Sequence, residues 1–249
     1  MRGFNPYLYI FLIFIYKKFI TFFFFIEIYK YSFLNKIKKK IKNKFKILNI
    51  GSNKGQISKL INFFFPNSFC ILEFDPYNNN LIRNIKNIIF YNFGLGSINK
   101  KKKIYIPYYK NFVLDSYIST NKNIILSNLK TDNFNKKYIF LKEKISVFKT
   151  LDSLNIKPFF VKIDTEGSEY DILMGGKRTI KNYNPIILLE VNSFLEFRKI
   201  SIYLKKNHKY DPFIFFKNKF QKINFVKNIK KVQGDIFFLS KKSFKYLNS

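Results

Sequence analysis

The strongest constraint on this chain is a series of short apolar runs that alternate with turn or helix signals. Between the first two runs, QISKLINFF (56–64) has its apolar residues at helical spacing, and NNNLIRNIKN (78–87) is a second candidate helix. Continuous apolar strands that alternate with helices indicate an α/β fold, with a parallel sheet covered by helices on both faces. The five runs are FKILNI (45–50), FCILEF (69–74), IIFYNFGLG (88–96), FFVKI (159–163) and PIILLEV (185–191).

Four further runs predict strands of other kinds. DPFIFF (211–216) and GDIFFLS (234–240) predict an antiparallel pair near the end of the chain. KKKIYIP (101–107) and KISVFKTL (144–151) predict outlying strands around a polar middle region.

The N-terminal residues 1–44 are expected to form a hydrophobic, Lys-rich extension ahead of a domain over 45–249. Residues 7–26 have the length of a membrane span, but Lys17 and Lys18 lie at their centre and make a span costly. The apolar residues recur every three or four positions, and this pattern fits a helix lying on the domain or on a membrane surface equally well. We therefore expect a cytoplasmic protein in which residues 7–26 form a helix that packs on the domain or lies on a membrane surface, and a true span is the less favoured alternative.

The charge balance is strongly basic, with 46 Lys and Arg, 15 Asp and Glu and a net charge of +31. Such a balance is typical of proteins that bind nucleic acid or anionic membranes. Nearly all the basic residues are Lys, however, whereas base and phosphate contacts favour Arg. We interpret the charge as surface and compositional bias, so nucleic acid is disfavoured as a partner.

The single Cys70 and single His208 exclude an internal disulfide and a Cys- or His-rich metal site.

Two motifs at predicted strand ends suggest a nucleotide-binding edge. GSNKG (51–55) follows the first strand, and its glycines allow a ligand to approach the backbone closely. Asp75 follows the second strand, 24 residues after Gly51, where an acid can accept hydrogen bonds from both ribose hydroxyls. Each motif alone is also explained by a tight turn or by a strand-ending Asp-Pro. The third glycine of G-x-G-x-x-G is absent, which argues against a nicotinamide oxidoreductase.

Acidic residues are concentrated in VKIDTEGSEYDILMGG (161–176), where four of the 15 acids fall within eight positions. Ser168 and Asp171 fit a capping box, and Glu169 and Asp171 would lie in the first turn of the helix, where the helix dipole favours negative charge. Asp164 and Glu166 have no such explanation, because they sit at the strand end and in the turn. Glu190 ends the next strand, so acids follow strands two, four and five at the edge where ligands bind.

The chain resembles the FkbM family of S-adenosylmethionine-dependent methyltransferases over residues 45 to about 195. The resemblance implies a class I methyltransferase (Rossmann-like) fold, with a seven-stranded, mostly parallel sheet whose last strand is reversed. It also implies S-adenosylmethionine as cofactor, held at Gly51, Asn53, Gly55 and Asp75, with Asn49 and Asn92 beside it. Asn49 stands where the family usually has Asp, and this loss of charge predicts weaker cofactor binding. The matching segments are ILNIGSNKGQIS (47–58), LEFDP (72–76), NFGLGS (92–97), TLDSL (150–154), VKIDTEGSEYDILMGG (161–176) and PIILLEVN (185–192).

The function that this resemblance implies is O-methylation of a hydroxyl on a sugar, glycan or other small metabolite. A hydroxyl acceptor must lose its proton during attack, and Asp164 or Glu166 is the candidate base. The alternative for Asp164 is that it only orders the turn, and Glu190 is expected to contact the substrate or lie just behind it. Nothing in the pattern requires a metal. We expect residues 107–150 and the C-terminal third to shape the acceptor pocket.

Two other functions remain open from the sequence. The first is a Lys-rich protein that binds RNA or an anionic membrane and carries a degenerate cofactor site, as the charge and Asn49 suggest. The second is an RNA methyltransferase, which combines the basic charge with the cofactor motifs.

Overall fold

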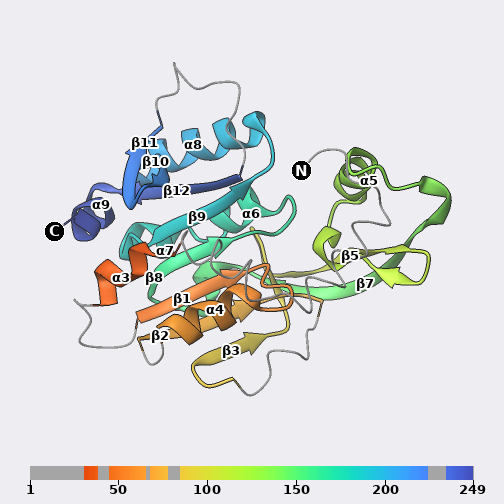
Figure 1. Ribbon diagram of the computed structural model, residues 1–249, viewed down its shortest axis with the longest axis horizontal. Helices are drawn as coiled ribbons and strands as arrows, with labels where there is room; N and C mark the ends of the chain where they lie inside the picture. The colour runs from red at the N-terminus through yellow and green to blue at the C-terminus, as the bar shows by residue number, and fades with distance from the viewer. Residues whose placement is uncertain (1–30, 39–44, 66–67, 78–84, 224–233, 249) are drawn as a thin grey trace.

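The computed structural model describes residues 31–38, 45–65, 68–77, 85–223 and 234–248 (Figure 1). Its centre is an eight-stranded sheet with the order β11-β10-β12-β9-β8-β1-β2-β3. The strands are β1 (Phe45–Ile50), β2 (Phe69–Phe74), β3 (Ile88–Tyr91), β8 (Pro158–Ile163), β9 (Ile186–Val191), β10 (Tyr210–Phe216), β11 (Lys219–Lys222) and β12 (Gly234–Ser240).

The sheet confirms the predicted α/β fold. Strands β1, β2, β3, β8 and β9 pair in parallel, and β12 pairs antiparallel with both β9 and β10. The seven predicted strands are all present. The eighth, β11, forms a hairpin with β10 at the sheet edge, and its sequence KFQK contains no apolar run that could have predicted it.

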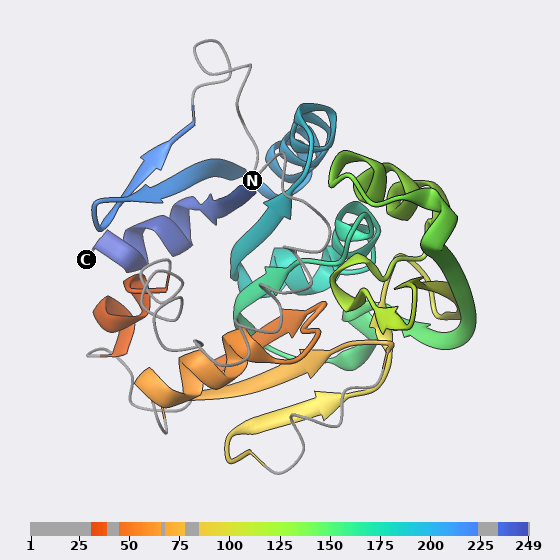
Figure 2. The same cartoon turned by 45° about the vertical axis from the view of Figure 1, so that its right-hand side comes forward.

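Helices cover both faces of the sheet, as predicted (Figure 2). One face packs against α6 (Glu169–Met174), α7 (Lys177–Tyr183) and α8 (Phe194–His208) through residues such as Ile172, Ile180 and Ile200. The other face packs against three further helices through residues such as Phe33, Leu60 and Leu247. These are α3 (Phe33–Lys38), α4 (Gln56–Phe64) and α9 (Lys241–Asn248).

The end of the predicted N-terminal extension packs on the sheet. Phe33 is fully buried and makes edge-to-face ring contacts with Phe160 and Phe237, at centroid distances of 5.4 and 5.3 Å. The hydrophobic segment 7–26 and residues 78–84 of the candidate helix at 78–87 lie outside the described residues. Within the part of the chain that the structure describes, no helix is long and apolar enough to cross a membrane.

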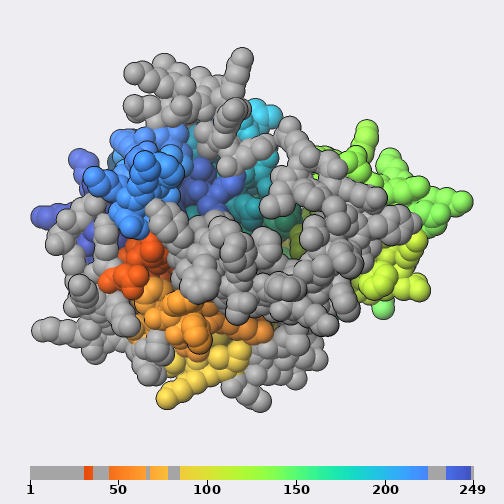
Figure 3. Space-filling model, viewed as in Figure 1, coloured from red at the N-terminus to blue at the C-terminus, as the bar shows by residue number. Residues whose placement is uncertain are grey.

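A second, four-stranded sheet lies beside the first and projects from one side of the molecule (Figures 1 and 3). Its longest strands, β5 and β7, pair antiparallel, which confirms the two predicted outlying strands. A third apolar cluster forms between this sheet and α5 (Lys122–Thr131). The strand order is β4-β7-β5-β6, with β4 (Gly94–Leu95), β5 (Lys100–Tyr109), β6 (Phe112–Val113) and β7 (Ile139–Lys149).

Candidate active site

The acids predicted at the strand ends lie in one row across the sheet. Phe74, Ile50, Ile163 and Leu189 are register partners on β2, β1, β8 and β9. The next residues along these strands are Asp75, Gly51, Asp164 and Glu190. Because the strands are parallel, all four residues lie side by side at the carboxyl edge, which we call the rim row.

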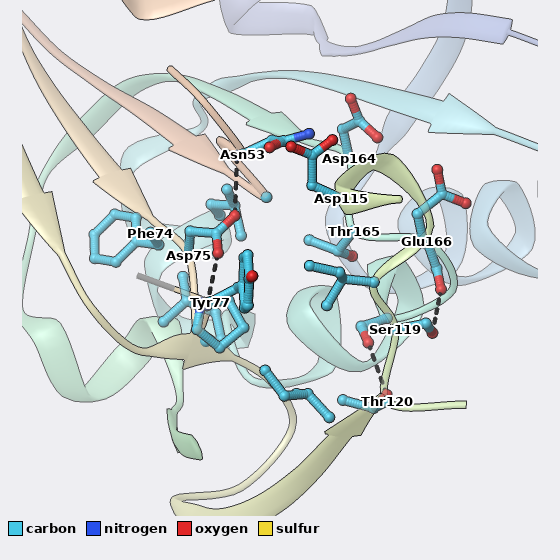
Figure 4. Close-up of a pocket in the computed structure, with 18 of the residues that line it drawn as sticks. Asn53, Phe74, Asp75, Tyr77, Asp115, Ser119, Thr120, Asp164, Thr165 and Glu166 are labelled. Carbon is cyan, nitrogen blue, oxygen red and sulfur yellow. Dashed lines mark hydrogen bonds between the residues drawn. The ribbon is translucent and has the colours of Figure 1, made fainter. Parts of the chain in front are cut away.

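The rim row borders a cavity of about 350 Å³ (Figure 4), a volume within the range of small-molecule sites. Six of the predicted site residues line this cavity. The opposite wall comes from residues near the second sheet, among them Asp115, Ser119, Thr120 and Phe148. Residues of the 107–150 region thus line this cavity, whereas the C-terminal third contributes only Ser168 and Glu190 among the described lining residues. That either region shapes an acceptor pocket stays a prediction. The six predicted residues are Gly51, Asn53, Asp75, Asp164, Glu166 and Glu190.

Three predicted cofactor residues lie outside the cavity lining. Asn49 is buried on β1 and donates a hydrogen bond through Nδ2 to Ser58 Oγ at 3.0 Å. Gly55 is the residue before α4 and has a left-handed backbone with φ of 64°. Asn92 is exposed in the segment after β3. Their proposed roles at the cofactor stay predictions.

The turn after β1 requires glycine at its first position. Gly51 has φ of +79°, and a Cβ there would lie 1.7 Å from the Asp164 carbonyl oxygen. The glycine thus lets the turn lie directly against the end of β8. Lys54, in the same turn, forms an ion pair with Asp115 from the opposite wall, which links the two sides of the cavity.

Asp75 is held rigidly by the backbone around it. Its Oδ2 accepts a hydrogen bond from the Asn53 backbone N–H at 2.9 Å, and its Oδ1 accepts one from the Tyr77 backbone N–H at 2.8 Å (Figure 4). Burial raises the pKa of this carboxyl above its usual value, while the two backbone donors oppose the shift. Two carboxylate oxygens can accept about four hydrogen bonds, so Asp75 keeps acceptor capacity for a ribose. The residues present therefore fit a nucleoside cofactor.

Glu169 organises the turn between β8 and α6. Its carboxylate is 1% exposed and accepts hydrogen bonds from the Thr165 backbone N–H, Thr165 Oγ1 and the Gly167 backbone N–H at 2.8, 2.9 and 3.0 Å. The predicted capping box is wrong, because the Ser168 side chain makes no hydrogen bond to the helix backbone. Its hydroxyl lies 3.4 Å from Thr120 Oγ1 instead.

Glu166 lies in that turn with a left-handed backbone, φ 53°, and borders the cavity. Its carbonyl oxygen accepts a hydrogen bond from Ser119 Oγ at 2.8 Å, and its Oε2 accepts one from Asn128 Nδ2 at 3.3 Å. Burial, followed by repulsion from Asp164 and Glu169, raises the pKa of its carboxyl to about 8.

Asp164 and Glu190 form the acidic centre of the rim row. The Asp164 Oδ2 lies 2.6 Å from the ammonium of Lys162, two residues earlier on β8. Burial, and then the neighbouring Asp164 carboxylate, raise the pKa of Glu190 to about 8. The Asp164 carboxylate, which is paired with the Lys162 ammonium, thus lies beside the Glu190 carboxyl, which stays protonated at neutral pH.

The sequence analysis did not predict two of the three polar residues beneath the rim row, Glu73 and Lys162. Glu73, Asn49 and Lys162 are register partners on β2, β1 and β8, two residues before the rim, and are 0%, 2% and 7% exposed. Glu73 and Lys162 each interrupt an otherwise apolar strand two positions before a rim residue, and this spacing could have revealed them, because residues i and i+2 share a face of the sheet.

The strand order, with β12 reversed at one side of a parallel sheet, and the glycine and acid rim define a Rossmann-like methyltransferase fold. A model of the methyltransferase FkbM domain matches residues 49–224, and the chain therefore belongs to the FkbM methyltransferase family. A comparison with curated proteins gives no significant match.

Two solved structures show what the chain is similar to. Methyltransferase FkbM from Methylobacillus flagellatus KT is 13% identical with a TM-score of 0.49, over 78% of this chain and 43% of that one. Precorrin-6y C5,15-methyltransferase from Geobacter metallireducens GS-15 is 11% identical with a TM-score of 0.38, over 83% of both chains. This chain thus spans less than half the length of the first of these proteins.

Proposed function

We propose that the protein is an S-adenosylmethionine-dependent O-methyltransferase that acts on a hydroxyl of a sugar, glycan or other small metabolite. The observation that carries the proposal is the rim row. Gly51, Asp75 and Asp164 border one cavity, so a nucleoside site and a candidate base share a single space.

On the cofactor side, Asp75 would accept hydrogen bonds from the ribose hydroxyls, and the Gly51 turn would allow the rest of the ligand to lie close to the backbone. S-adenosylmethionine would supply a methyl group on a positively charged sulfur. Carboxylates around the cavity favour such a cation. Alignment of the acceptor with the methyl group accounts for much of the acceleration expected of such an enzyme.

On the acceptor side, Ser119 and Thr120 offer hydroxyls that can orient a polar substrate, and Asp164 or Glu166 would take the acceptor proton. The described lining residues include five acids and neither Lys nor Arg, although the chain carries 46 basic residues. This lining favours a neutral hydroxyl acceptor over a phosphate-bearing one, and so supports a small acceptor over RNA. The five acids are Asp75, Asp115, Asp164, Glu166 and Glu190.

Calorimetric titration with S-adenosylmethionine and S-adenosylhomocysteine tests the proposal. We expect both ligands to bind, and Asp75→Asn to weaken both by about tenfold or more, because the amide presents N–H groups where the carboxylate accepted hydrogen bonds. Asp211→Asn is the matched control, since Asp211 pairs with Lys205 and does not line the cavity. If neither ligand binds the wild-type protein, the proposal is wrong.

A further inference from the structure

Lys162 is a buried cation beneath the rim row. It lies on β8 between Asn49 of β1 and Leu188 of β9, and its side chain is 9% exposed. A charge withdrawn from water to this extent is costly unless it is paired. The position of the group that pairs with Lys162 therefore indicates the role of this lysine.

The partner of Lys162 is the rim carboxylate that lines the cavity. Lys162 Nζ lies 2.6 Å from Asp164 Oδ2, and the two side chains lie on the same face because they are two residues apart. Asp164 borders the cavity and its side chain is 30% exposed, whereas Lys162 is not among the lining residues. The ammonium thus contacts the Asp164 carboxylate from a position outside the cavity, while Asp164 itself borders the cavity.

Apart from Lys162 and Lys54, the titratable groups that face Asp164 are acids. Glu190 stands beside it on β9, and Asp235 is the register partner of Glu190 on β12. Glu166 follows in the turn, and Asp115 faces Asp164 from the opposite wall, where Asp115 is paired with Lys54 (Figure 4). Among these acidic groups, Lys162 supplies the ammonium that pairs directly with Asp164.

We propose that Lys162 is a positioning residue that holds Asp164 toward the cavity in its carboxylate form. The proposal rests on the proposed function, in which Asp164 either takes the acceptor proton or faces the sulfonium. Both roles need an ionised Asp164, so Lys162 acts on the reaction without touching a substrate.

The test compares the affinities for S-adenosylmethionine, which has a cationic sulfur, and S-adenosylhomocysteine, whose sulfur is neutral. Their ratio reports the negative charge beside the sulfur and needs no acceptor. In Lys162→Met we expect the ratio at about pH 6 to fall roughly tenfold and to recover at higher pH, because removal of an adjacent cation raises a carboxyl pKa by about one to three units. Lys162→Gln retains a hydrogen-bond donor but no charge, and we expect the same fall.

Two controls separate this role from a merely structural one. Lys162→Arg keeps the charge and is expected to keep the wild-type ratio. Lys205→Met removes a lysine that also pairs at 2.6 Å, with Asp211 outside the cavity, and should leave the ratio unchanged. If Lys162 were only structural, Lys162→Met would weaken both ligands equally at every pH.

A ratio that is unchanged or higher at about pH 6 in Lys162→Met or Lys162→Gln overturns the proposal. Should both variants fail to fold, carbon NMR of the wild-type carboxyl groups gives the answer, with the Asp164 signal assigned through Asp164→Asn. The signal is expected to be that of a carboxylate down to about pH 5, and a titration above about pH 6 overturns the proposal. Failure of wild-type protein to bind either ligand would instead overturn the proposed function.

Discussion

At the scale of single residues, Glu73 gives a structural reason for the amide at position 49. The two residues are register partners on β1 and β2, and Glu73 is completely buried. Its carboxyl makes no hydrogen bond of standard geometry with the described residues, although Ser58 and Asn49 lie close enough to favour its charged form. Burial dominates and raises its pKa to about 7. An aspartate at position 49 would place a second carboxyl beside it.

We therefore expect Asn49→Asp to destabilise the protein by about 2–4 kcal/mol, because it adds a second buried acid beside Glu73 and the neighbouring Lys162 is already paired with Asp164. Asn49→Asp combined with Glu73→Gln should recover most of this loss, with a coupling energy above about 1 kcal/mol. Urea unfolding of the four proteins in the cycle measures both quantities. Additive effects would show that the two side chains do not interact. Because Asn49 does not line the cavity, Asn49→Asp is not expected to strengthen cofactor binding.

Asp164→Asn should abolish turnover, because the amide can neither take a proton nor carry negative charge. Binding of S-adenosylhomocysteine should stay close to that of the wild type, since its sulfur is uncharged. Transfer of isotopically labelled methyl groups to a panel of neutral sugars measures turnover, and calorimetry measures binding. Near-normal turnover would remove Asp164 from the list of candidate bases.

The pH profile separates the two candidate bases. A base must be deprotonated before it acts, so if Glu166 takes the proton, turnover rises as pH increases through about 8, where its carboxyl ionises. Glu166→Gln would then abolish turnover together with that rise. If Asp164 takes the proton, Glu166→Gln retains turnover at neutral pH.

At the scale of elements, the turn between β8 and α6 depends on Glu169. Glu169→Ala removes the acceptor of three partly buried hydrogen bonds, and we expect it to cost about 1–3 kcal/mol of unfolding free energy and to weaken cofactor binding. Asp171→Ala, two residues later, is the control. Its side chain is 49% exposed and lies 3.4 Å from Lys102, so its loss should cost less than about 1 kcal/mol. Equal losses for the two variants in urea unfolding would contradict this account of the turn.

The elements that could be predicted from sequence are those with a local pattern. Strands of the main sheet appear as continuous apolar runs, and the rim row follows because parallel strands end at the same edge. For the opposite wall only the region 107–150 could be expected. That Asp115 and Ser119 line the cavity could not be predicted, since it depends on how the chain between β5 and β7 folds back. The Lys162–Asp164 ion pair was not predicted for a different reason. Lys162 lies within an apolar run, which predicts a strand but does not indicate that the lysine side chain pairs with Asp164.

At the scale of the whole molecule, charge is divided between the surface and the interior. The chain carries a net charge of +31, yet four buried or partly buried glutamates have pKa values raised to about 7 or 8, in each case mainly by burial. Three of them, Glu73, Glu166 and Glu190, lie in or directly beneath the rim of the cavity. A basic exterior thus surrounds glutamates that ionise only near or above pH 7. The free energy of unfolding should therefore depend on pH.

Because the folded protein keeps a proton on Glu73 that the unfolded chain releases above about pH 4.5, stability should fall as pH rises from 4.5 to about 7 and then level off. The predicted loss from this one residue is about 3 kcal/mol, at about 1.4 kcal/mol per pKa unit. Glu73→Gln mimics the protonated form. The variant should therefore match the wild type near pH 4.5 and exceed it by up to about 3 kcal/mol near pH 7.

The difference between Glu73→Gln and the wild type isolates this effect, because repulsion among the surface lysines is nearly the same in both proteins and cancels. Urea unfolding at several pH values measures the difference. Glu143→Gln provides the control, since Glu143 is about half exposed in an ion pair with Lys103, and its removal should shift stability by less than about 1 kcal/mol at every pH. A difference between Glu73→Gln and the wild type that stays constant with pH would mean that Glu73 is not protonated in the folded protein. Ser58, Asn49 and Lys59, the groups that lower the pKa of Glu73, would then be enough to keep its buried carboxylate ionised.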